Sequence, residues 1–295
     1  MLQIADAEEQ YNKIKGLKKT DVVLLQEWLK KQPHLPPIEE LKLIQFLHSC
    51  FYSLEKTKVT IDNYYTIKTE SPEIFGKKDP VQFNQTINEG VCIPLPQLTS
   101  EGYQIHYVKL LECDPYTYIP EQHFKYCYIC LFLRLMEIGP VEGVVIVIDM
   151  KNVTLAHITR LPLMTVKKCA FFMQEAFPVR LKSIHCINAV SFIDIIMTIL
   201  KPFLKKELLN LFHFHHKIET LYTYVPLKCL PSDMGGEEKS LSELYEATKR
   251  RIADNAKYIE KYEREVVDES KRMEKTHNVK TLFGTEGSFK KLDID

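Results

Sequence analysis

Cysteine and histidine residues at short spacing are the features of this sequence that could support chemistry. Cys127 and Cys130 have the CxxC spacing of metal and redox sites, but no second pair lies at the distance that a zinc ribbon requires. His213, His215 and His216 form the densest histidine cluster. On a helix, adjacent and alternate positions point in different directions, so these three side chains could not easily bind one metal ion. The sequence therefore predicts no metal site.

Nucleophilic catalysis has equally weak support. His185 and Cys186 are the residue types of a general base and a thiol nucleophile, yet neighbours on a strand face opposite sides of a sheet and cannot pair. None of the ten glycines forms GxGxxG or GxxxxGK, so no phosphate-binding loop is predicted. We expect no catalytic residues and no enzyme activity. An enzyme that combines Cys186 or Cys127 with a histidine remains an alternative.

Composition limits the class of protein further. The chain has 295 residues, of which 45% are hydrophobic, and its 39 basic side chains balance 39 acidic ones. Such a chain can bury a sizeable core, and it lacks the bulk positive charge of a nucleic-acid-binding protein. The N-terminus MLQIADAEEQ has no signal-peptide pattern, and no apolar stretch reaches the roughly 20 residues of a membrane span. We expect a cytoplasmic protein whose eight scattered cysteines are reduced.

The elements that must position these residues alternate between helices and strands. Residues 1–75 contain helical patterns, and residues 76–100, rich in glycine and proline, are interpreted as a connection. The remaining predicted segments are strands at 103–111, 143–149 and 180–187 and helices at 118–138, 162–176, 190–200 and 202–212. This order predicts an α/β fold in which an N-terminal helical unit precedes a largely parallel sheet flanked by helices.

A charged segment follows at 241–273. Five apolar side chains fall seven residues apart along it, namely Tyr245, Ile252, Ile259, Val266 and Met273. We interpret the segment as a helix that lies along the domain surface, with a coiled coil as the alternative. The tail at 282–295 carries two phenylalanines and is expected to dock on the protein.

The segment AVSFIDIIMTIL at 189–200 is apolar on nearly every side. Such a helix is either buried in the core, or lies against a ligand or a membrane. Basic residues flank it, and we expect them to contact an anionic membrane or, as the alternative, to form a solvated rim. These residues are Arg180, Lys182, Lys201, Lys205 and Lys206.

The second half of the chain contains three distinctive motifs, FPVRLKSIHCIN at 177–188, KPFL at 201–204 and LP followed by GG within 230–236. They resemble motifs of the CRAL-TRIO family, which includes tocopherol and retinaldehyde carriers. The likeness extends to FLHSC at 46–50 and GVCIPLP at 90–96. It implies an N-terminal helical unit at 1–90, a lipid-binding domain at 91–240 and a charged helix with a docking tail at 241–295.

The resemblance also implies an apolar cavity for one lipid, floored by the sheet, and a gate helix that acts as a lid. By position, the cavity residues are Tyr126, Cys130, Val144, Ile146, Ile148, Leu155, Cys169, Phe172, Met173, Phe177, Val179 and Leu181. The lid residues are Phe192, Ile193, Ile196, Met197, Ile199 and Leu200. His123 and Thr154, with Tyr126 and Cys130, are candidates for polar groups that orient the ligand. On strand 180–187, alternation independently places Val179 and Leu181 opposite Arg180 and Lys182.

The expected function is binding and transfer of one hydrophobic lipid, such as a retinoid, carotenoid, tocopherol-like prenol or phospholipid. No cofactor other than this lipid is implied. The expected partners are the lipid and, transiently, an anionic membrane that contains phosphoinositide, where Arg180 and Lys182 match the basic pair of family members that bind it. We expect a monomer and no nucleic-acid partner. The alternative is a lipid-responsive interaction module that uses helix 241–273 and has no transfer role.

Overall fold

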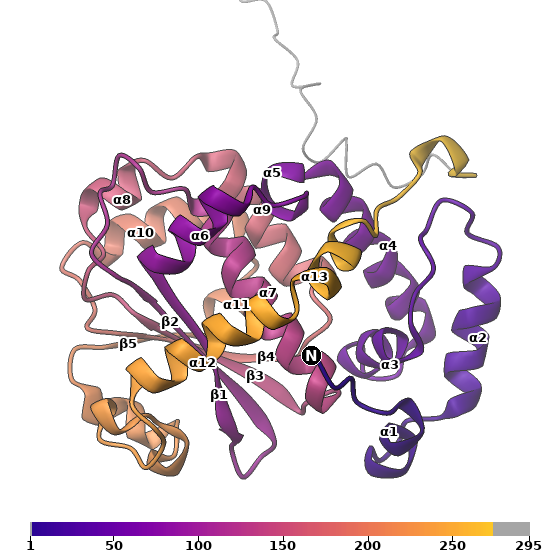
Figure 1. The fold of residues 1–295 in the computed structure, drawn as a ribbon, viewed down its shortest axis with the longest axis horizontal. Coiled ribbons are helices and arrows are strands. Elements are labelled where there is room, and N and C mark those ends of the chain that lie inside the picture. Colours follow the sequence, from indigo (N-terminus) through magenta and orange to yellow (C-terminus); the bar gives the residue numbers. More distant parts are fainter. Residues whose placement is uncertain (1, 274–295) are drawn as a thin grey trace, which may run out of the picture.

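A five-stranded sheet lies at the centre of the computed structural model, which describes residues 2–273 (Figure 1). The strands are β1 (Gly90–Leu98), β2 (Tyr103–Leu110), β3 (Gly143–Asp149), β4 (Leu181–Ile187) and β5 (Phe212–His215). They are hydrogen-bonded in the order β1-β2-β3-β4-β5. Only the β1 and β2 pair is antiparallel among these neighbours, so the sheet is largely parallel as predicted.

Helices cover one face of this sheet, and 3-10 turns together with part of the C-terminal helix cover the other. The bounds of the helices are α1 (Ala7–Lys13), α2 (Lys19–Leu29), α3 (Glu40–Ser49), α4 (Leu54–Glu70), α5 (Pro72–Phe75), α6 (Pro80–Glu89), α7 (Pro120–Ile138), α8 (Leu155–Thr159), α9 (Leu163–Phe171), α10 (Ile193–Leu200), α11 (Lys206–Leu209), α12 (Leu241–Asp254) and α13 (Ala256–Glu263). A π-helical turn, Phe172–Ala176, continues α9. Ser53 caps α4, whereas α2 begins after Lys18 without a side-chain cap.

The apolar run of β3 is buried on both faces, as its composition predicts. Val145 and Val147 pack on the face covered by the segment that contains Leu221 and Val225. Val144 lies on the other face, in the core beneath α7. Because this strand is central and parallel to both neighbours, it holds the side chains of one face in a fixed row.

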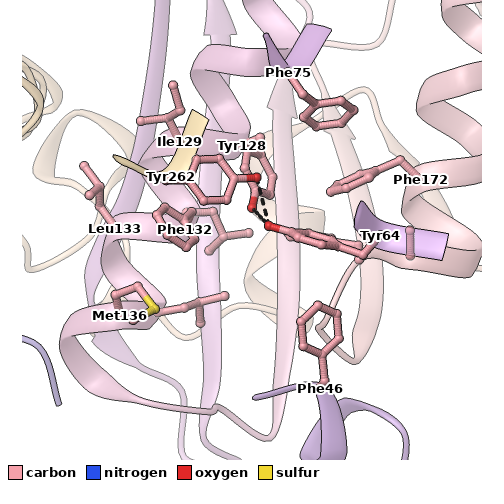
Figure 2. Close-up of a cluster of buried hydrophobic side chains, with 14 of the residues drawn as sticks. Phe46, Tyr64, Phe75, Tyr128, Ile129, Phe132, Leu133, Met136, Phe172 and Tyr262 are labelled. Atoms are coloured by element: carbon pink, nitrogen blue, oxygen red, sulfur yellow. Dashed lines mark hydrogen bonds between the residues drawn. The ribbon is translucent and has the colours of Figure 1, made fainter. Parts of the chain in front are cut away.

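One continuous core joins the N-terminal helices to the sheet domain. Figure 2 shows its centre, where the hydroxyl of Tyr64 on α4 lies 2.5 Å from that of Tyr128 on α7 and 2.8 Å from that of Tyr262 on α13. Aromatic rings surround the three hydroxyls, with Phe132 4.4 Å from Tyr262 between ring centroids. The hydrogen-bonded hydroxyls satisfy one another within the buried core, so helices far apart in sequence pack as one body.

Two segments differ from the prediction. Residues 76–100 contain α6 and the whole of β1. Because β1 is an edge strand, it can accommodate Pro94 and Pro96. Residues 202–212 do not form one helix: a 3-10 turn and the four-residue α11 lead into β5. His213 and His215 therefore lie on a strand.

The charged C-terminal segment lies along the domain surface, and the helix breaks at Asn255. Ile252 and Ile259 are buried in the chain's own core, which favours the surface-helix interpretation over the coiled coil. Val266 and Met273 follow the end of α13 and are exposed. The predicted docking tail lies outside the described residues.

Candidate functional site

A cavity of about 480 Å³ lies between one face of the sheet and the helices that cover it. Its floor consists of alternate side chains of four neighbouring strands. Strand register brings them together in two rows, Val108, Ile148, Cys186 and Phe214 in the first and His106, Ile146, Ile184 and Phe212 in the second. Because these are mostly apolar, the sheet presents a hydrophobic surface to whatever fills the cavity.

One face of α7 forms a wall. Side chains three or four residues apart line the cavity, namely Pro120, His123, Phe124, Cys127, Tyr128 and Leu131. Gly90 on β1 leaves room for the His123 imidazole, since an added Cβ would lie 3.2 Å from its Cδ2. The opposite wall comes from α9 and the π-helical turn, with Thr165, Val166, Cys169, Ala170, Phe172 and Met173.

Helix α10 closes a further side of the cavity. Ile193, Ile196, Met197 and Leu200 line the cavity, while Ile195 is 43% exposed. No residue of α10 is buried, although the helix is apolar along almost its whole length. The alternative of a core helix is therefore wrong. A helix with few buried contacts is the kind of element that opens at low cost in free energy.

The charged groups of the cavity lining are paired with each other. Lys109 Nζ lies 3.3 Å from Asp149 Oδ2, and Asp149 also accepts hydrogen bonds from Tyr107 at 2.9 Å and Asn188 at 2.7 Å. Although burial opposes it, these hydrogen bonds and Lys109 hold the pKa of Asp149 below its ordinary value. The pair fixes the carboxyl ends of β2 and β3 rather than offering a free charge.

Several polar side chains lie at the α7 side of the cavity. Burial lowers the pKa of His123 and raises that of the Cys92 thiol, so both are neutral near pH 7. Cys92 on β1 and Cys127 on α7 have their sulfur atoms in contact. His106 on β2 completes this polar region. The contact with Cys92 and, to a smaller extent, the nearby His106 ring lower the pKa of the Cys127 thiol to about 6.

The structure brings half of the predicted cavity residues together. Ile146, Ile148, Cys169, Phe172, Met173 and Phe177 line the cavity, as do the lid residues Ile193, Ile196, Met197 and Leu200. Of the predicted polar groups, His123 is part of the lining. These residues come from β3, α9, α10 and their flanking turns, where the predicted strands and helices match those of the structure.

Other predicted cavity residues lie elsewhere. Tyr126 and Cys130 are buried on another face of α7, where Tyr126 meets Phe83 of α6 edge-on with 6.2 Å between ring centroids. The cavity face of α7 carries Cys127 instead, one position from Tyr126. Val144 is buried beyond the end of the cavity.

Residues in three connecting segments also fall outside the lining. Leu155 is 42% exposed at the start of α8, and Thr154 caps that helix through His157. Val179 packs on the main core just before β4, and Phe192 and Ile199 flank the cavity-facing positions of α10. None of these side chains lines the cavity.

A β-bulge in β4 changes which side chains of this strand face the cavity. Val144 pairs with Leu181 and Val145 with Ser183, so Lys182 is an extra residue and the alternation shifts by one position. Ile184 and Cys186 therefore reach the cavity. Leu181 shares their side of the sheet but packs beside the cavity.

The basic residues separate into two groups. Arg180 is nearly buried, bonded to the His48 carbonyl and to Glu142, which disagrees with its expected role as a head-group contact. Lys182 extends over Gly143 toward the Tyr103 ring. By contrast, Lys201, Lys205 and Lys206 are exposed after α10, and Lys205 pairs with Glu175.

The histidines that prompted the metal question form a stacked cluster on the sheet face opposite the cavity. His185 Nδ1 lies 2.9 Å from His215 Nε2, and the His213 ring stacks on His185 with 4.9 Å between centroids. Within residues 2–273, no group of three or more histidine, cysteine or acidic side chains is arranged to hold a metal ion. In the same part of the chain, no helix has the length and apolar character needed to cross a bilayer.

A family model for the CRAL/TRIO domain matches residues 88–236, about half of the chain, which includes the sheet and the cavity. The chain belongs to the CRAL/TRIO domain family. A second model, for the Pinta-like UBA domain, matches residues 14–84 in the N-terminal helices.

Relatives of this CRAL/TRIO protein have similar sequences over most of its length. The "Alpha-tocopherol transfer protein-like" proteins of Mus musculus and Homo sapiens are 27% and 26% identical over 220 residues, 73% of this chain and 64% of theirs. "Clavesin-1" of Xenopus laevis is 28% identical over 97 residues, 32% of this chain and 29% of its own. The match thus spans somewhat less than two thirds of the first relatives' length. The crystal structure of Sfh5 aligns with 73% of this chain and over 82% of the Sfh5 chain, at 10% sequence identity and with a TM-score of 0.47.

Proposed function

We propose that this CRAL/TRIO protein binds one hydrophobic lipid in its cavity and transfers it between membranes, with α10 as a mobile lid and without a catalytic step. The observation that carries the proposal is the position of α10. An apolar helix without a single buried residue forms one side of a cavity of about 480 Å³. That volume lies within the range of cavities that hold one small organic ligand.

A carrier lowers the free-energy cost of moving a lipid out of a bilayer. At about 0.8 kcal/mol for each buried CH₂ group, a lipid of some twenty carbons leaves a bilayer for water at a cost of roughly 16 kcal/mol. The apolar rows on the sheet and on α9 would replace the bilayer's hydrocarbon and remove much of that cost. The names of the "Alpha-tocopherol transfer protein-like" relatives support a tocopherol-like prenol as one ligand class, beside retinoids, carotenoids and phospholipids.

The membrane step uses the outside of the same helix. Ile195 is exposed on α10, and Lys201 and Lys206 follow it on the surface. Cations beside an apolar helix suit an anionic bilayer surface, including one that contains phosphoinositide. Arg180 takes no part, because its guanidinium is bonded within the protein. The protein would be cytoplasmic, monomeric and transiently bound at membranes.

The alternative, an interaction module built on the C-terminal helices, has less support. Ile252 and Ile259 of the apolar stripe are buried within the chain's own core. Those side chains are therefore not free to bind a partner.

A vesicle experiment tests the proposal. Donor vesicles containing a fluorescent tocopherol are mixed with acceptor vesicles and the full chain, and transfer is measured against protein-free background. Ile195→Ser should slow transfer severalfold, because less apolar surface enters the bilayer. Val81→Ser, at an 80% exposed valine on α6, is the matched control and should leave the rate unchanged. Transfer no faster than background with wild-type protein, for every ligand class named above, would reject the carrier function.

A further inference from the structure

Cys92 and Cys127 form a pair of thiols in the wall of the cavity. Their sulfur atoms lie 2.6 Å apart, Cys92 on β1 and Cys127 on α7, and both residues line the cavity. The CxxC spacing of the sequence joins Cys127 to Cys130, but Cys130 is buried on another face of α7. Disulfides of cytosolic proteins are usually transient and redox-active. Two thiols in contact, contributed by different elements, therefore point to redox chemistry.

The two thiols differ in acidity. Contact with Cys92 and, against the effect of burial, the nearby His106 ring lower the pKa of Cys127 to about 6, whereas burial raises the pKa of Cys92. Cys127 is thus largely a thiolate near pH 7, and Cys92 keeps its proton. The thiolate is the nucleophilic form of cysteine. The pair combines an attacking sulfur with a second thiol in contact with it, as a two-electron oxidation to a disulfide requires.

The pair faces the cavity rather than the protein surface. Cys92 is 1% exposed, and strand register places it at the end of the first floor row, beside Val108 and in line with Ile148 and Cys186. An oxidant in the cavity lies among apolar side chains, on a side of the sheet that α10 helps to close. Apolar molecules concentrate in such a site, whereas strongly hydrated ones do not. The position therefore favours an oxidant that is itself a lipid.

We propose that Cys92 and Cys127 reduce a hydroperoxide group on a lipid bound in the cavity and are themselves oxidised to a disulfide. The Cys127 sulfur attacks the terminal oxygen of the hydroperoxide, so that an S–O bond forms and the O–O bond breaks. The leaving alkoxide takes up one proton, equal to the one that Cys127 lost on forming its thiolate. The products of this step are a lipid alcohol and the sulfenic acid of Cys127.

Cys92 completes the reaction. Its sulfur attacks the Cys127 sulfur, the S–S bond forms, and the S–O bond breaks. The hydroxide leaves as water with the proton of the Cys92 thiol. One hydroperoxide thus oxidises both thiols, and a thiol reductant has to restore them before a second reaction. The inference rests on the proposed carrier function, because the lipid has to enter the cavity, and it adds a redox step to that function.

Oxidation of the reduced full chain tests the inference. The chain is freed of reductant and incubated with phosphatidylcholine vesicles that contain methyl linoleate hydroperoxide, an uncharged ester. Titration after denaturation should show the loss of two of the eight thiols, and peptide mass spectrometry should find Cys92 linked to Cys127. One equivalent of the hydroxy ester should form for each protein molecule. Hydrogen peroxide at the same concentration should act about tenfold more slowly, because it does not concentrate among apolar side chains.

Three serine variants separate the steps. Cys127→Ser lacks the attacking sulfur, so thiol loss and formation of the hydroxy ester should both fall to background. Cys92→Ser cannot form the disulfide, so the hydroxy ester should still form and dimedone, a reagent for sulfenic acids, should label Cys127. This second variant keeps the test possible if Cys127→Ser fails to fold. Cys186→Ser is the matched control, because Cys186 lies in the same floor row three strands from Cys92, about 14 Å away, and it should behave as the wild type.

The possible failures are distinguishable. A chain that binds the hydroperoxide and keeps all eight thiols, or a Cys127→Ser variant that forms the hydroxy ester at the wild-type rate, would overturn the inference and leave the carrier function intact. Equally fast oxidation by hydrogen peroxide would also overturn it, since the oxidant would then not need the cavity. Uptake of unoxidised methyl linoleate is measured in parallel. Wild-type protein that binds neither ester would count against the carrier function itself.

Discussion

Arg180 donates two hydrogen bonds to the main-chain carbonyl oxygen of His48, from Nε at 2.9 Å and from Nη2 at 2.6 Å. Its Nη1 donates to Glu142 at 3.0 Å, and the Phe51 ring lies 4.4 Å from its guanidinium carbon. Arg180 directly precedes β4, while His48 belongs to α3. The guanidinium therefore ties the N-terminal helices to the sheet that floors the cavity.

Replacement of Arg180 should lower stability rather than membrane binding. Arg180→Ala leaves a carbonyl without its donor and removes a nearly buried charge-assisted contact, so we expect a loss of about 2 kcal/mol in the free energy of unfolding. Denaturant unfolding measures it. Lys206→Ala, at an exposed position, is the control and should stay within about 0.5 kcal/mol of the wild type. An Arg180 variant as stable as the wild type would refute the structural role of this residue.

Membrane binding should depend on the exposed lysines after α10. Each of Lys201→Ala and Lys206→Ala should weaken binding to vesicles that contain anionic lipid by about fivefold, since a lysine near such a surface contributes about 1 kcal/mol. Co-sedimentation at low ionic strength is the measurement, and added salt should abolish the difference. Lys257→Ala, an exposed position on α13, provides the control. Equal losses in all three variants would mean that binding reflects overall charge and not this patch.

The two faces of β3 should respond differently to a larger side chain. Ile148→Phe fills part of the cavity, so it should reduce the amount of bound lipid with little change in stability. Val147→Phe enlarges a fully buried side chain on the opposite, closely packed face and should cost about 1–3 kcal/mol of stability. Lipid content after vesicle incubation and denaturant unfolding are measured on both variants. Identical behaviour of the two would contradict a cavity on one face only.

The histidine cluster should make stability depend on pH. Burial, with a smaller effect of the neighbouring His213 and His215, lowers the pKa of His185 to about 4. The unfolded chain then binds the proton more readily than the folded one, so stability is complete above about pH 6.5 and is lost as the pH falls through 4. We expect a loss of about 1–2 kcal/mol from this residue across that interval after allowance for solvent screening.

His185→Gln tests this dependence. The variant should be less stable than the wild type at pH 8, because hydrogen bonds to Ser183 and His215 change. Its stability should nevertheless fall less steeply between pH 6.5 and 4.5. His48, whose pKa burial also lowers to about 4, remains in the variant, as do His123, His157 and His215, whose pKa values burial lowers as well. Part of the slope should therefore persist. A slope equal to that of the wild type would assign the pH dependence to other groups.

The local sequence pattern predicted most of the strands and helices that line the cavity, but not which of their side chains face it. The β-branched run of β3 and the alternation of β2 correspond to strands in the structure, and α7 lies within its predicted helix. By contrast, the bulge at Lys182 depends on how β4 pairs with β3, and a single strand's sequence carries no mark of it. Strict alternation counted from Leu181 therefore missed Ile184 and Cys186, which line the cavity.

Tertiary packing also determined which face of α7 meets the cavity. The helix is apolar on several faces, and α6 takes the face with Tyr126. Neither α6 nor β1 was predicted from residues 76–100, because the prolines of this segment are typical of connections. The strand tolerates them because it lies at the edge of the sheet. The position of His106 in the cavity floor was also missed, because it depends on how β2 pairs with its neighbouring strands and not on the local sequence.

Native mass spectrometry of the full chain after incubation with lipid vesicles measures the central claim most directly. The account predicts a single added mass equal to one lipid molecule per protein, and Ile148→Phe should reduce the occupied fraction. A chain that keeps its unliganded mass with every lipid class offered, while folded and monomeric, would contradict a cavity that holds one hydrophobic ligand beneath α10.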